Sequence, residues 1–461
     1  MVNALRQPGK GFYRNVFMLM TPMVLQNLIT QTVALTDTFM VGMLGEQFLA
    51  AMPIAQVPLF IVLIFTFGIQ SGLGILVSQY WGKGNLEIIN RALGVALYFT
   101  AIVTFSAAIV MNFFPSQILS LVTNDASLVE LAVPYARITA FSMALNSISM
   151  VYLSCHRSME NPRLGAIVLS VSATFSIFWN WVLIFGNLGF PALGIQGAAI
   201  STLCARALEV IIISIHAFCN SRFRVRLVLL LRPGMTIFRD FLKYSMPVLV
   251  NEALWGIGAM LFPVIFGHMT GSQTILAAYN IASNLDRLFA VALFASGGAA
   301  AVIIGREIGA GRKDLAESAA KSLNILGLIL GFISGGLLLL AQFTILEPYV
   351  FPLYDLSPEA SRTATIMLII VAIALPLRVI CFTSGIGALR AGGDVKAFML
   401  IDVGALYFIS LPIAAITGLV LGLGVEFVFS SILIENSVKT ALLLRRLKSR
   451  KWIHDITRDH I

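Results

Sequence analysis

Residues 22–42 read PMVLQNLITQTVALTDTFMVG, and Asp37 is the only charged side chain in this run. An α-helix rises about 1.5 Å per residue, so the run is long enough to cross the roughly 30 Å hydrocarbon core of a bilayer. A charged side chain near the bilayer centre costs about 2.5–3.5 kcal/mol on insertion scales and is rare unless it serves a function. The run therefore predicts a membrane-spanning helix that carries a functional carboxylate.

The rest of the 461-residue chain has the same apolar character. Hydrophobic residues make up 58% of it and charged residues only 11%, whereas an average globular protein carries roughly 25% charged residues. So few charged side chains cannot form the surface of a soluble protein of this length. Apolar runs of about twenty residues recur from end to end, each long enough to span a bilayer. The composition predicts a polytopic, all-α membrane protein.

Twelve apolar runs are separated by short polar gaps. We expect them to form twelve transmembrane helices, at residues 15–43, 49–79, 92–114, 129–155, 164–187, 194–218, 244–268, 275–305, 322–343, 361–388, 398–419 and 424–444.

The net charge of +9 would fit a nucleic-acid-binding protein, but its distribution along the chain indicates a membrane topology instead. Lys and Arg gather at the N-terminus, in every second gap and in the C-terminal tail. The gaps between carry acids such as Glu46, Asp125 and Glu347. Because basic residues are retained on the cytoplasmic side, this alternation predicts an even number of helices and two cytoplasmic termini. We expect a multi-pass protein of the cell membrane with no nucleic-acid partner.

The chain also resembles itself at about half its length. The segment Pro22–Gly42 corresponds to Pro247–Gly267, with the same proline-to-glycine spacing, and the polar loop at 157–163 corresponds to the loop at 390–396. Six helices separate the copies, an even number, so both copies have the same orientation in the membrane. This predicts a parallel repeat, as in other transporters built from two related halves.

The repeat sets the expected domain organisation. We predict an N-terminal six-helix lobe at residues 1–218, a basic cytoplasmic linker at 219–243 and a C-terminal six-helix lobe with a basic tail at 244–461. The linker is rich in arginine, which fits a segment lying on the anionic inner leaflet.

Polar side chains in the first lobe fall at similar depths. Asp37, Asn180 and Thr202 each lie seven or eight residues inside the expected outer end of their helices, which places them roughly 10–12 Å below the outer surface. Ser176 lies four residues before Asn180, on the same helix face. Such an oxygen-rich group suits a proton or a small hard cation such as sodium. Alternatively, Asn180 and Thr202 form ordinary interhelical hydrogen bonds. We expect Arg206 to lie near the cytoplasmic interface.

The second lobe has charged candidates of its own. Glu252, Asp286 and Arg287 fall near mid-membrane, and Arg378 is also deep. They form either a second ion-coupling site or structural salt bridges of Glu252 or Asp286 with Arg287 or Arg378. We expect Asp402 to be interfacial.

Several motifs resemble those of the multidrug and toxic compound extrusion (MATE) family. They are the segment at 22–42 with its Asp37, VSQYWGKGN at 77–85, NWVLIFGNLGFPALGIQGAAIST at 180–202, PVLVNEALWG at 247–256 and RAGGDVK at 390–396. Each motif is loose by itself, but together they are specific and extend over nearly the whole chain.

The resemblance implies a fold of two six-helix lobes around a central cleft, and export of organic cations in exchange for sodium ions or protons. Asp37 matches the family's acidic residue of the first helix, and Thr202 matches a hydroxyl implicated in ion binding. Asn180 falls where some members carry a second acid, and Ser176 where those members carry an amide. Glu252 matches an acidic position used by another branch. A sodium site would use Asp37, Asn180 and Thr202.

We therefore expect a secondary active antiporter that exports cationic or amphipathic compounds by alternating access. A flippase for a lipid-linked glycan or peptidoglycan precursor is the alternative, but it would need more deep arginines. No metalloprotease motif, serine–histidine pairing or P-loop is present, so we expect neither an enzyme nor a nucleotide-driven pump. We expect a monomer without a cofactor. The physiological substrate, the choice between sodium and proton, and the lobe that carries the ion stay open at this point.

Overall fold

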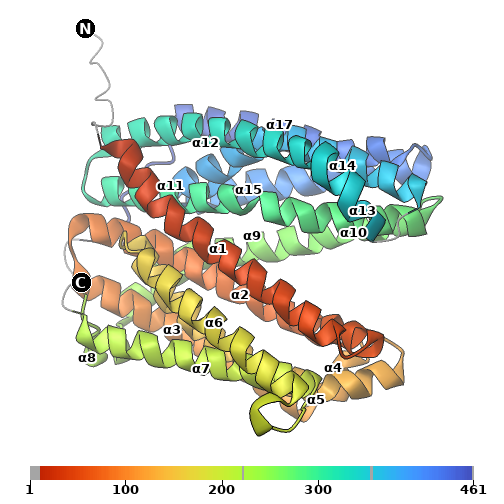
Figure 1. Ribbon diagram of the computed structural model, residues 1–461. Helices are drawn as coiled ribbons and strands as arrows, with labels where there is room; N and C mark the ends of the chain where they lie inside the picture. Colours follow the sequence, from red (N-terminus) through yellow and green to blue (C-terminus); the bar gives the residue numbers. More distant parts are fainter. Residues whose placement is uncertain (1–10, 221–222, 354–356, 459–461) are drawn as a thin grey trace. The chain divides into compact units, whose positions relative to one another are not determined.

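The computed structural model describes residues 11–220, 223–353 and 357–458, and the described chain is almost entirely helical (Figure 1). The first part of the chain forms α1 (Phe12–Gly42), α2 (Glu46–Lys83), α3 (Leu86–Phe113), α4 (Pro115–Leu119), α5 (Ala126–Ser158), α6 (Arg163–Phe185), the short 3₁₀ helix η1 (Asn187–Gly189), α7 (Ile195–Cys219) and α8 (Leu227–Leu231).

The second part begins with α9 (Met235–Gly267), which corresponds to α1 in the repeat. It continues with α10 (Ser272–Phe289), α11 (Val291–Gly309), α12 (Lys313–Ala341) with the π-helical η2 (Gln342–Val350), α13 (Phe351–Leu353), α14 (Pro358–Cys381) with η3 (Phe382–Arg390), the series α15 (Val395–Ala405), η4 (Leu406–Ser410), α16 (Leu411–Ala415) and η5 (Ile416–Val420), and α17 (Val425–Lys448).

Within the described residues, twelve helical stretches are long and apolar enough to cross a membrane. This confirms the expected all-α fold with twelve spans. Cys155, Cys204, Cys219 and Cys381 are free thiols.

The helix bounds differ from the predicted ones where a helix continues beyond its apolar run through charged residues. The helix expected to begin at residue 244 begins at Met235, and the helix expected at 322 begins at Lys313. Apolar runs mark only the part of a helix inside the hydrocarbon region, so they miss such extensions. The single helix expected at 275–305 is divided at Ala290, whose carbonyl accepts a 3₁₀-type bond from the Leu293 N–H at 3.0 Å.

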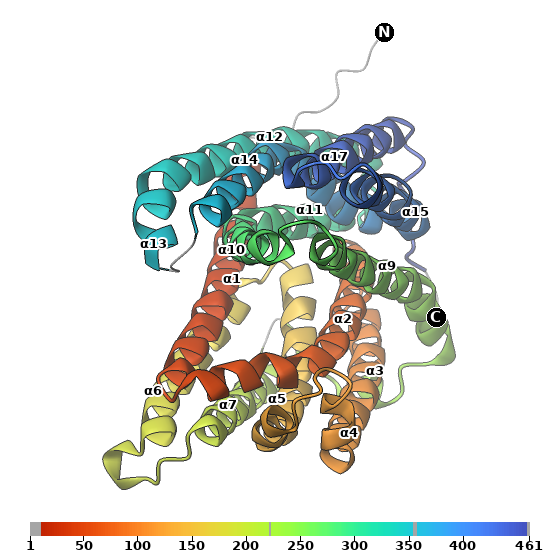
Figure 2. The ribbon, with the colours of Figure 1, turned by 90° about the vertical axis from the view of Figure 1, so that its right-hand side faces the viewer.

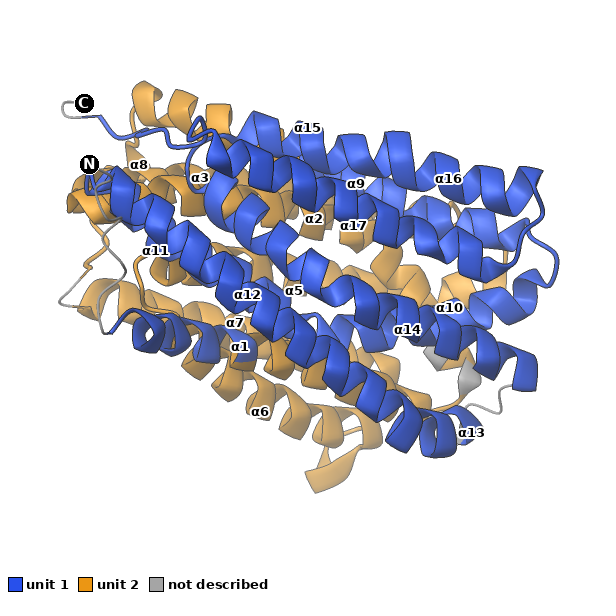
Figure 3. Ribbon diagram, turned by 90° about the horizontal axis from the view of Figure 1, so that it is seen from above, with its two compact units in different colours: residues 1–24, 250–458 blue, residues 25–249, 459–461 orange. Residues whose placement is uncertain are grey.

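The helices form two compact units, coloured separately in Figure 3. Unit 1 takes in the chain up to Val24 and Val250–Arg458, and unit 2 is Leu25–Leu249. Helices α1 and α9 are each continuous through both units, since the division falls within them. The units are defined by which residues contact one another, so they differ from the lobes expected at 1–218 and 244–461. The division into two repeat lobes stays a prediction.

In unit 1, closely spaced glycines bring α12 and α14 together. Gly327, Gly331 and Gly335 recur every fourth residue on α12, and a Cβ at Gly331 would lie 2.5 Å from the Pro376 Cα. Small residues at this spacing let membrane helices approach at backbone distance. The first half of α1 packs on this unit through Val16, Leu19, Met20 and Met23, which belong to a core cluster with α11, α12 and α17.

In unit 2, α2, α3 and α5 pack against one another, and α5 and α6 both pack on α7 (Figure 2). Glycines again set the closest approach, because Gly68 faces Leu249 and Gly72 faces Ser245, both at the start of α9. A Cβ at Gly72 would lie 1.9 Å from the Ser245 Oγ, so no larger residue fits there without a shift.

Candidate functional site

The candidate site in unit 2 depends on a tight hairpin between α6 and α7. Gly186 ends α6 with φ of 75°, a left-handed conformation that favours glycine. The Leu193 N–H then donates to the Leu183 carbonyl at 2.9 Å, and a Cβ at Gly197 would lie 2.5 Å from that same oxygen. The hairpin therefore holds the two helices at backbone distance near their connected ends.

The second half of α1 is joined to α6 by a polar contact near the start of α6. The Gln26 side-chain amide donates to the Pro162 carbonyl at 2.5 Å. A Cβ at Gly165 would lie 2.6 Å from the Gln26 Nε2, so only glycine leaves room for this amide. This contact aligns α1 along α6 and brings Asp37 to the level of Asn180.

Three polar side chains meet there, one from each helix. The Asn180 Nδ2 donates to the Asp37 Oδ1 at 2.5 Å, and the Ser201 hydroxyl donates to the Asn180 Oδ1 in a short hydrogen bond. Asn180 and Ser201 are completely buried, whereas Asp37 is partly exposed. The Ser201 hydroxyl also lies 3.0 Å from the carbonyl of Ala198 in its own helix. The Asn180 amide directs an N–H toward the Asp37 carboxylate, which can only accept hydrogen bonds when it is ionised. We call Asp37, Asn180 and Ser201 the Asp37 site.

The structure places the other two predicted residues of this group differently. The Thr202 hydroxyl donates to the Ala198 carbonyl of its own helix at 3.0 Å, and Ser201, its neighbour, is the residue that contacts Asn180. Ser176 is buried one turn away from Asn180, and its hydroxyl has no hydrogen-bond partner among the described residues.

Asp37 forms no ion pair with Lys or Arg in the part of the chain that the structure describes. Its partner is a neutral amide, although the charge of Arg206 also acts on it. Arg206 has an acidic partner, because its Nη1 lies 2.5 Å from the Oε1 of Glu209, a residue with 0% exposure. Its expected position near the cytoplasmic interface stays a prediction. A carboxylate whose only direct partner is neutral keeps its capacity to bind a proton or a small cation.

The predicted acids of unit 1 all have basic partners. The Glu252 Oε1 lies 2.5 Å from the Arg390 Nη2, and the Asp286 Oδ1 lies 2.5 Å from the Arg378 Nη1. Arg390 was expected in a cytoplasmic loop, but it is buried at the end of η3, where its guanidinium also stacks on Phe398. Of the second-lobe candidates, Arg287 alone is exposed and has no acidic partner among the described residues.

A further ionic cluster lies at the contact of α15 and α17. The Lys439 Nζ lies 2.7 Å from Asp402 and 2.6 Å from Glu435, and Asn251 on α9 also donates to Asp402 at 3.2 Å. Asp402 and Lys439 are both largely buried within unit 1, where Lys439 offsets one of the two negative charges beside it. The expected position of Asp402 near the membrane interface stays a prediction.

Sequence reasoning missed Ser201, Glu209 and Arg390. A signal for the first two exists, because Gly197, Ser201, Ala205 and Glu209 recur every fourth residue and form the buried face of α7. Thr202 lies one position off this face. No comparable signal exists for Arg390, since its partner is 138 residues away in the sequence.

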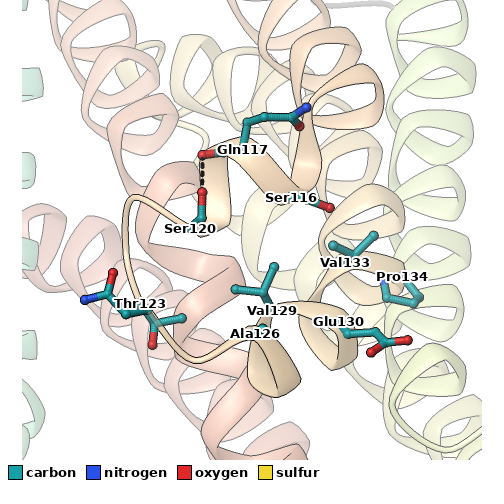
Figure 4. Close-up of a pocket in the computed structure, with 10 residues that line it drawn as sticks. Ser116, Gln117, Ser120, Thr123, Ala126, Val129, Glu130, Val133 and Pro134 are labelled. Atoms are coloured by element: carbon teal, nitrogen blue, oxygen red, sulfur yellow. Dashed lines mark hydrogen bonds between the residues drawn. The ribbon is translucent and has the colours of Figure 1, made fainter.

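An open pocket, separate from the Asp37 site, lies where α4 meets α5. Figure 4 shows Ser116, Gln117 and Ser120 on one side of it and Val129 and Glu130 on the other. No residue of the Asp37 site lines this pocket, so we do not assign ion binding to it.

Spanning helices with polar and ionic groups buried inside them define a polytopic membrane transporter as the class of protein. The chain belongs to the MatE family, whose model matches residues 22–182 and 247–416. The model thus matches twice, and each match begins at a proline of the internal repeat, Pro22 or Pro247. The resemblance to MATE transporters is confirmed.

Known proteins resemble the chain over nearly its full length. It is 24% identical over 411 residues to "Probable multidrug resistance protein YoeA" of Bacillus subtilis (strain 168), covering 87% of this chain and 86% of that protein. It is 22% identical to "Probable multidrug resistance protein NorM" of Thermotoga maritima, covering 95% and 93%.

Solved structures share the fold. A MOP superfamily transporter from Pyrococcus furiosus aligns with a TM-score of 0.85 at 18% identity, covering 97% of this chain and 100% of that one. The Vibrio cholerae MATE transporter VcmN in its bent form aligns with a TM-score of 0.82 at 19% identity, covering 96% and 99%.

Proposed function

We propose that the protein is a secondary active antiporter that exports cationic or amphipathic organic compounds in exchange for sodium ions or protons by alternating access. The observation that carries this proposal is the Asp37 carboxylate, which lies inside a membrane span and has a neutral amide as its direct partner. The multidrug resistance names of the relatives support the substrate class.

In the proposed cycle, a cation or proton binds Asp37 from outside and neutralises it. The Asn180 amide and the Ser201 hydroxyl then no longer face a full negative charge, so the position of α1 relative to α6 and α7 is expected to change. Because α1 is continuous through both units, a change at Asp37 acts on a helix that both units share. Substrate leaves outward, and the ion is then discharged to the cytoplasm. We place both termini there, from the alternation of basic gaps.

A flippase for lipid-linked precursors has less support. A pyrophosphate headgroup requires several free arginines. Of the two arginines predicted to lie deep, Arg378 is already paired with Asp286, which leaves Arg287 alone. The absence of a P-loop supports a gradient as the energy source, and we propose that a single chain is the functional unit.

The test is efflux of a fluorescent organic cation such as ethidium from proteoliposomes, with imposed proton and sodium gradients applied separately. The parent is expected to export under at least one gradient, and faster for the cation than for an anionic dye. Asp37→Asn keeps the size of the side chain but cannot change charge, so efflux should fall to the rate without a gradient while substrate still binds.

Asp286→Asn is the matched control, because it removes a carboxylate that is already paired with Arg378. It should retain gradient-driven efflux. Normal export by Asp37→Asn would contradict the proposal and make Glu252 with Asp286 the better candidates. Exclusive export of anions or of lipid-linked pyrophosphates would favour the flippase.

A further inference from the structure

A small, partly open cavity lies between α1, α6 and α7, within unit 2. Its polar lining consists of Thr30, Ser172, Ser176, Arg206 and Glu209, and the remaining lining residues are apolar. The space is about that of one water molecule. Nothing in the proposed exchange cycle uses this cavity or Glu209.

Two polar atoms at this cavity have no partner among the described residues. The Glu209 Oε1 is bound by Arg206 at 2.5 Å, but its Oε2 is buried and unbonded, although the residue has 0% exposure. The Ser176 Oγ is likewise buried and unbonded. Buried polar atoms are nearly always hydrogen-bonded, to protein or to an ordered water. Two such atoms lining one water-sized space indicate that a ligand able to hydrogen-bond occupies it.

The cavity lies directly next to the Asp37 site along all three helices. Val33 lines it and precedes Asp37 by four residues, and Ser176 precedes Asn180 by four. Glu209 follows Ser201 by eight residues on the same buried face of α7. The cavity therefore begins about 6 Å from the Asp37 site, one helical turn toward the predicted cytoplasmic side.

The charges around the cavity favour a neutral ligand. Arg206 and Glu209 are its only charged lining residues among those described, and they cancel each other. A sodium ion would lie beside the Arg206 guanidinium in a space too small for its remaining ligands. A water molecule can accept a hydrogen bond from the Ser176 hydroxyl and donate one to the Glu209 Oε2.

We propose that this cavity is a water-binding site formed by Ser176 and Glu209, and that the Arg206–Glu209 pair with its water is a positioning element for ion binding at Asp37. Glu209 offsets the positive charge of Arg206, which also acts on Asp37. Other charges are distant along the sequence: α1 has none between Arg14 and Asp37, and α6 has none after Arg163. This inference rests on the proposed ion-coupled function.

The first test is the half-saturating concentration of the driving ion for efflux from proteoliposomes. Glu209→Gln leaves the charge of Arg206 uncompensated, so this concentration should rise at least about fivefold, while the KM for ethidium stays unchanged. Ser176→Val fills the cavity with methyl groups and should give a rise in the same direction. A role in folding alone would lower the melting temperature and the amount of active protein without changing the ion requirement.

Matched controls are available in the chain. Ser170→Val makes the same substitution two residues from Ser172, at a hydroxyl that is bonded to the Ala166 carbonyl of its own helix. Glu317→Gln removes a buried carboxylate that pairs with Lys321 and Arg450 in unit 1. Both should leave the half-saturating ion concentration within about twofold of the parent.

The second test is direct. An experimental structure of the parent that resolves ordered waters should show one within hydrogen-bond distance of both the Ser176 Oγ and the Glu209 Oε2. An empty cavity in such a structure overturns the water site, even if Glu209→Gln fails to fold. An unchanged ion requirement in both Glu209→Gln and Ser176→Val overturns the positioning role. Failure of the proposed antiport function is a separate result. In that case Asp37→Asn would retain gradient-driven efflux, whatever the effect of Glu209→Gln or Ser176→Val.

Discussion

The predicted ion-coupling carboxylates of the two units have different kinds of partner, although unit 2 also pairs one buried acid, Glu209, with Arg206. In unit 2 the direct partner of Asp37 is an amide, which is itself held by the Ser201 hydroxyl. In unit 1 Glu252 pairs with Arg390, Asp286 pairs with Arg378, and Lys439 lies between two acids. Both arrangements satisfy the carboxylates, but only the arginine pairs of Glu252 and Asp286 also neutralise them one for one.

This difference is the basis of our proposal that Asp37 is the ion-coupling acid. A carboxylate paired with a buried guanidinium has its counter-charge built in, so binding a proton or sodium ion would break a pair and leave the guanidinium unpaired. A carboxylate held by neutral donors gains a counter-charge when the ion arrives. The internal repeat contains an acid in each half, and the different partners of these acids are the reason that we propose ion binding in unit 2.

The largest expected effect concerns the stability of unit 1. Glu252→Gln leaves the buried Arg390 without its counter-charge, so the free energy of unfolding should fall by about 3–5 kcal/mol. Asp37→Asn leaves no buried charge unpaired and should cost less than about 1.5 kcal/mol. Denaturant unfolding of the purified protein in detergent measures both values.

The double variant Glu252→Gln with Arg390→Met is the control for this comparison. Because it removes both charges together, it should recover much of the loss seen with Glu252→Gln alone. Equal losses for Glu252→Gln and Asp37→Asn would contradict the distinction between the two units.

A smaller effect on the ion requirement is expected from the hydroxyl groups at the Asp37 site. Ser201→Ala removes the donor that holds the Asn180 amide toward Asp37, so the half-saturating concentration of the driving ion should rise about three- to tenfold. Thr202→Ala removes a hydroxyl bonded to its own helix and should change it less than about twofold. The efflux rate of each variant is measured as a function of ion concentration. A larger effect of Thr202→Ala than of Ser201→Ala would mean that Thr202, not Ser201, belongs to the site.

The smallest effect concerns Asp125, an exposed carboxylate that also has only neutral donors. The Ser127 hydroxyl, then the N–H groups of Leu128 and Ser127, hold the pKa of Asp125 below its ordinary value of 3.8. The stability that Asp125 contributes as the cap of α5 is therefore present at neutral pH and lost as the pH falls through the lowered pKa. Asp125→Asn should slightly lower the melting temperature at pH 7.

The same measurement below the ordinary carboxyl pKa of 3.8 completes this prediction. At that pH the difference in melting temperature between Asp125→Asn and the parent should shrink toward zero. The reason is that the parent carboxyl becomes protonated and loses the charge that Asn lacks. A difference that persists unchanged in acid would mean that the charge of Asp125 contributes nothing at this helix end.

Much of the fold was predictable because membrane helices are defined by local composition. Apolar runs located the twelve spans, and the match between Pro22–Gly42 and Pro247–Gly267 located the repeat. The predictions failed where the cause was not hydropathy. The extensions of α9 and α12 contain charged residues that end the apolar runs, and the break at Ala290 depends on a local change in hydrogen bonding.

The candidate site was predictable only in part. The buried charge in an apolar run singled out Asp37, and similar depth singled out Asn180. Depth alone could not distinguish Ser201 from Thr202, because adjacent residues differ by only about 1.5 Å along the axis but point about 100° apart around it. The buried face of α7 makes that distinction, and it also contains Glu209.

The sequence by itself determined the class of protein, the number of spans, the repeat and the acidic residue of the first helix, because hydropathy and charge act locally along the chain. The tertiary structure alone decided which carboxylates are neutralised. Arg390 reaches Glu252 across 138 residues and Arg378 reaches Asp286 across 92, whereas an amide reaches Asp37 across 143. The identity of an acidic residue does not reveal whether its partner is a cation or an amide. Only the packing of distant helices determines that partner.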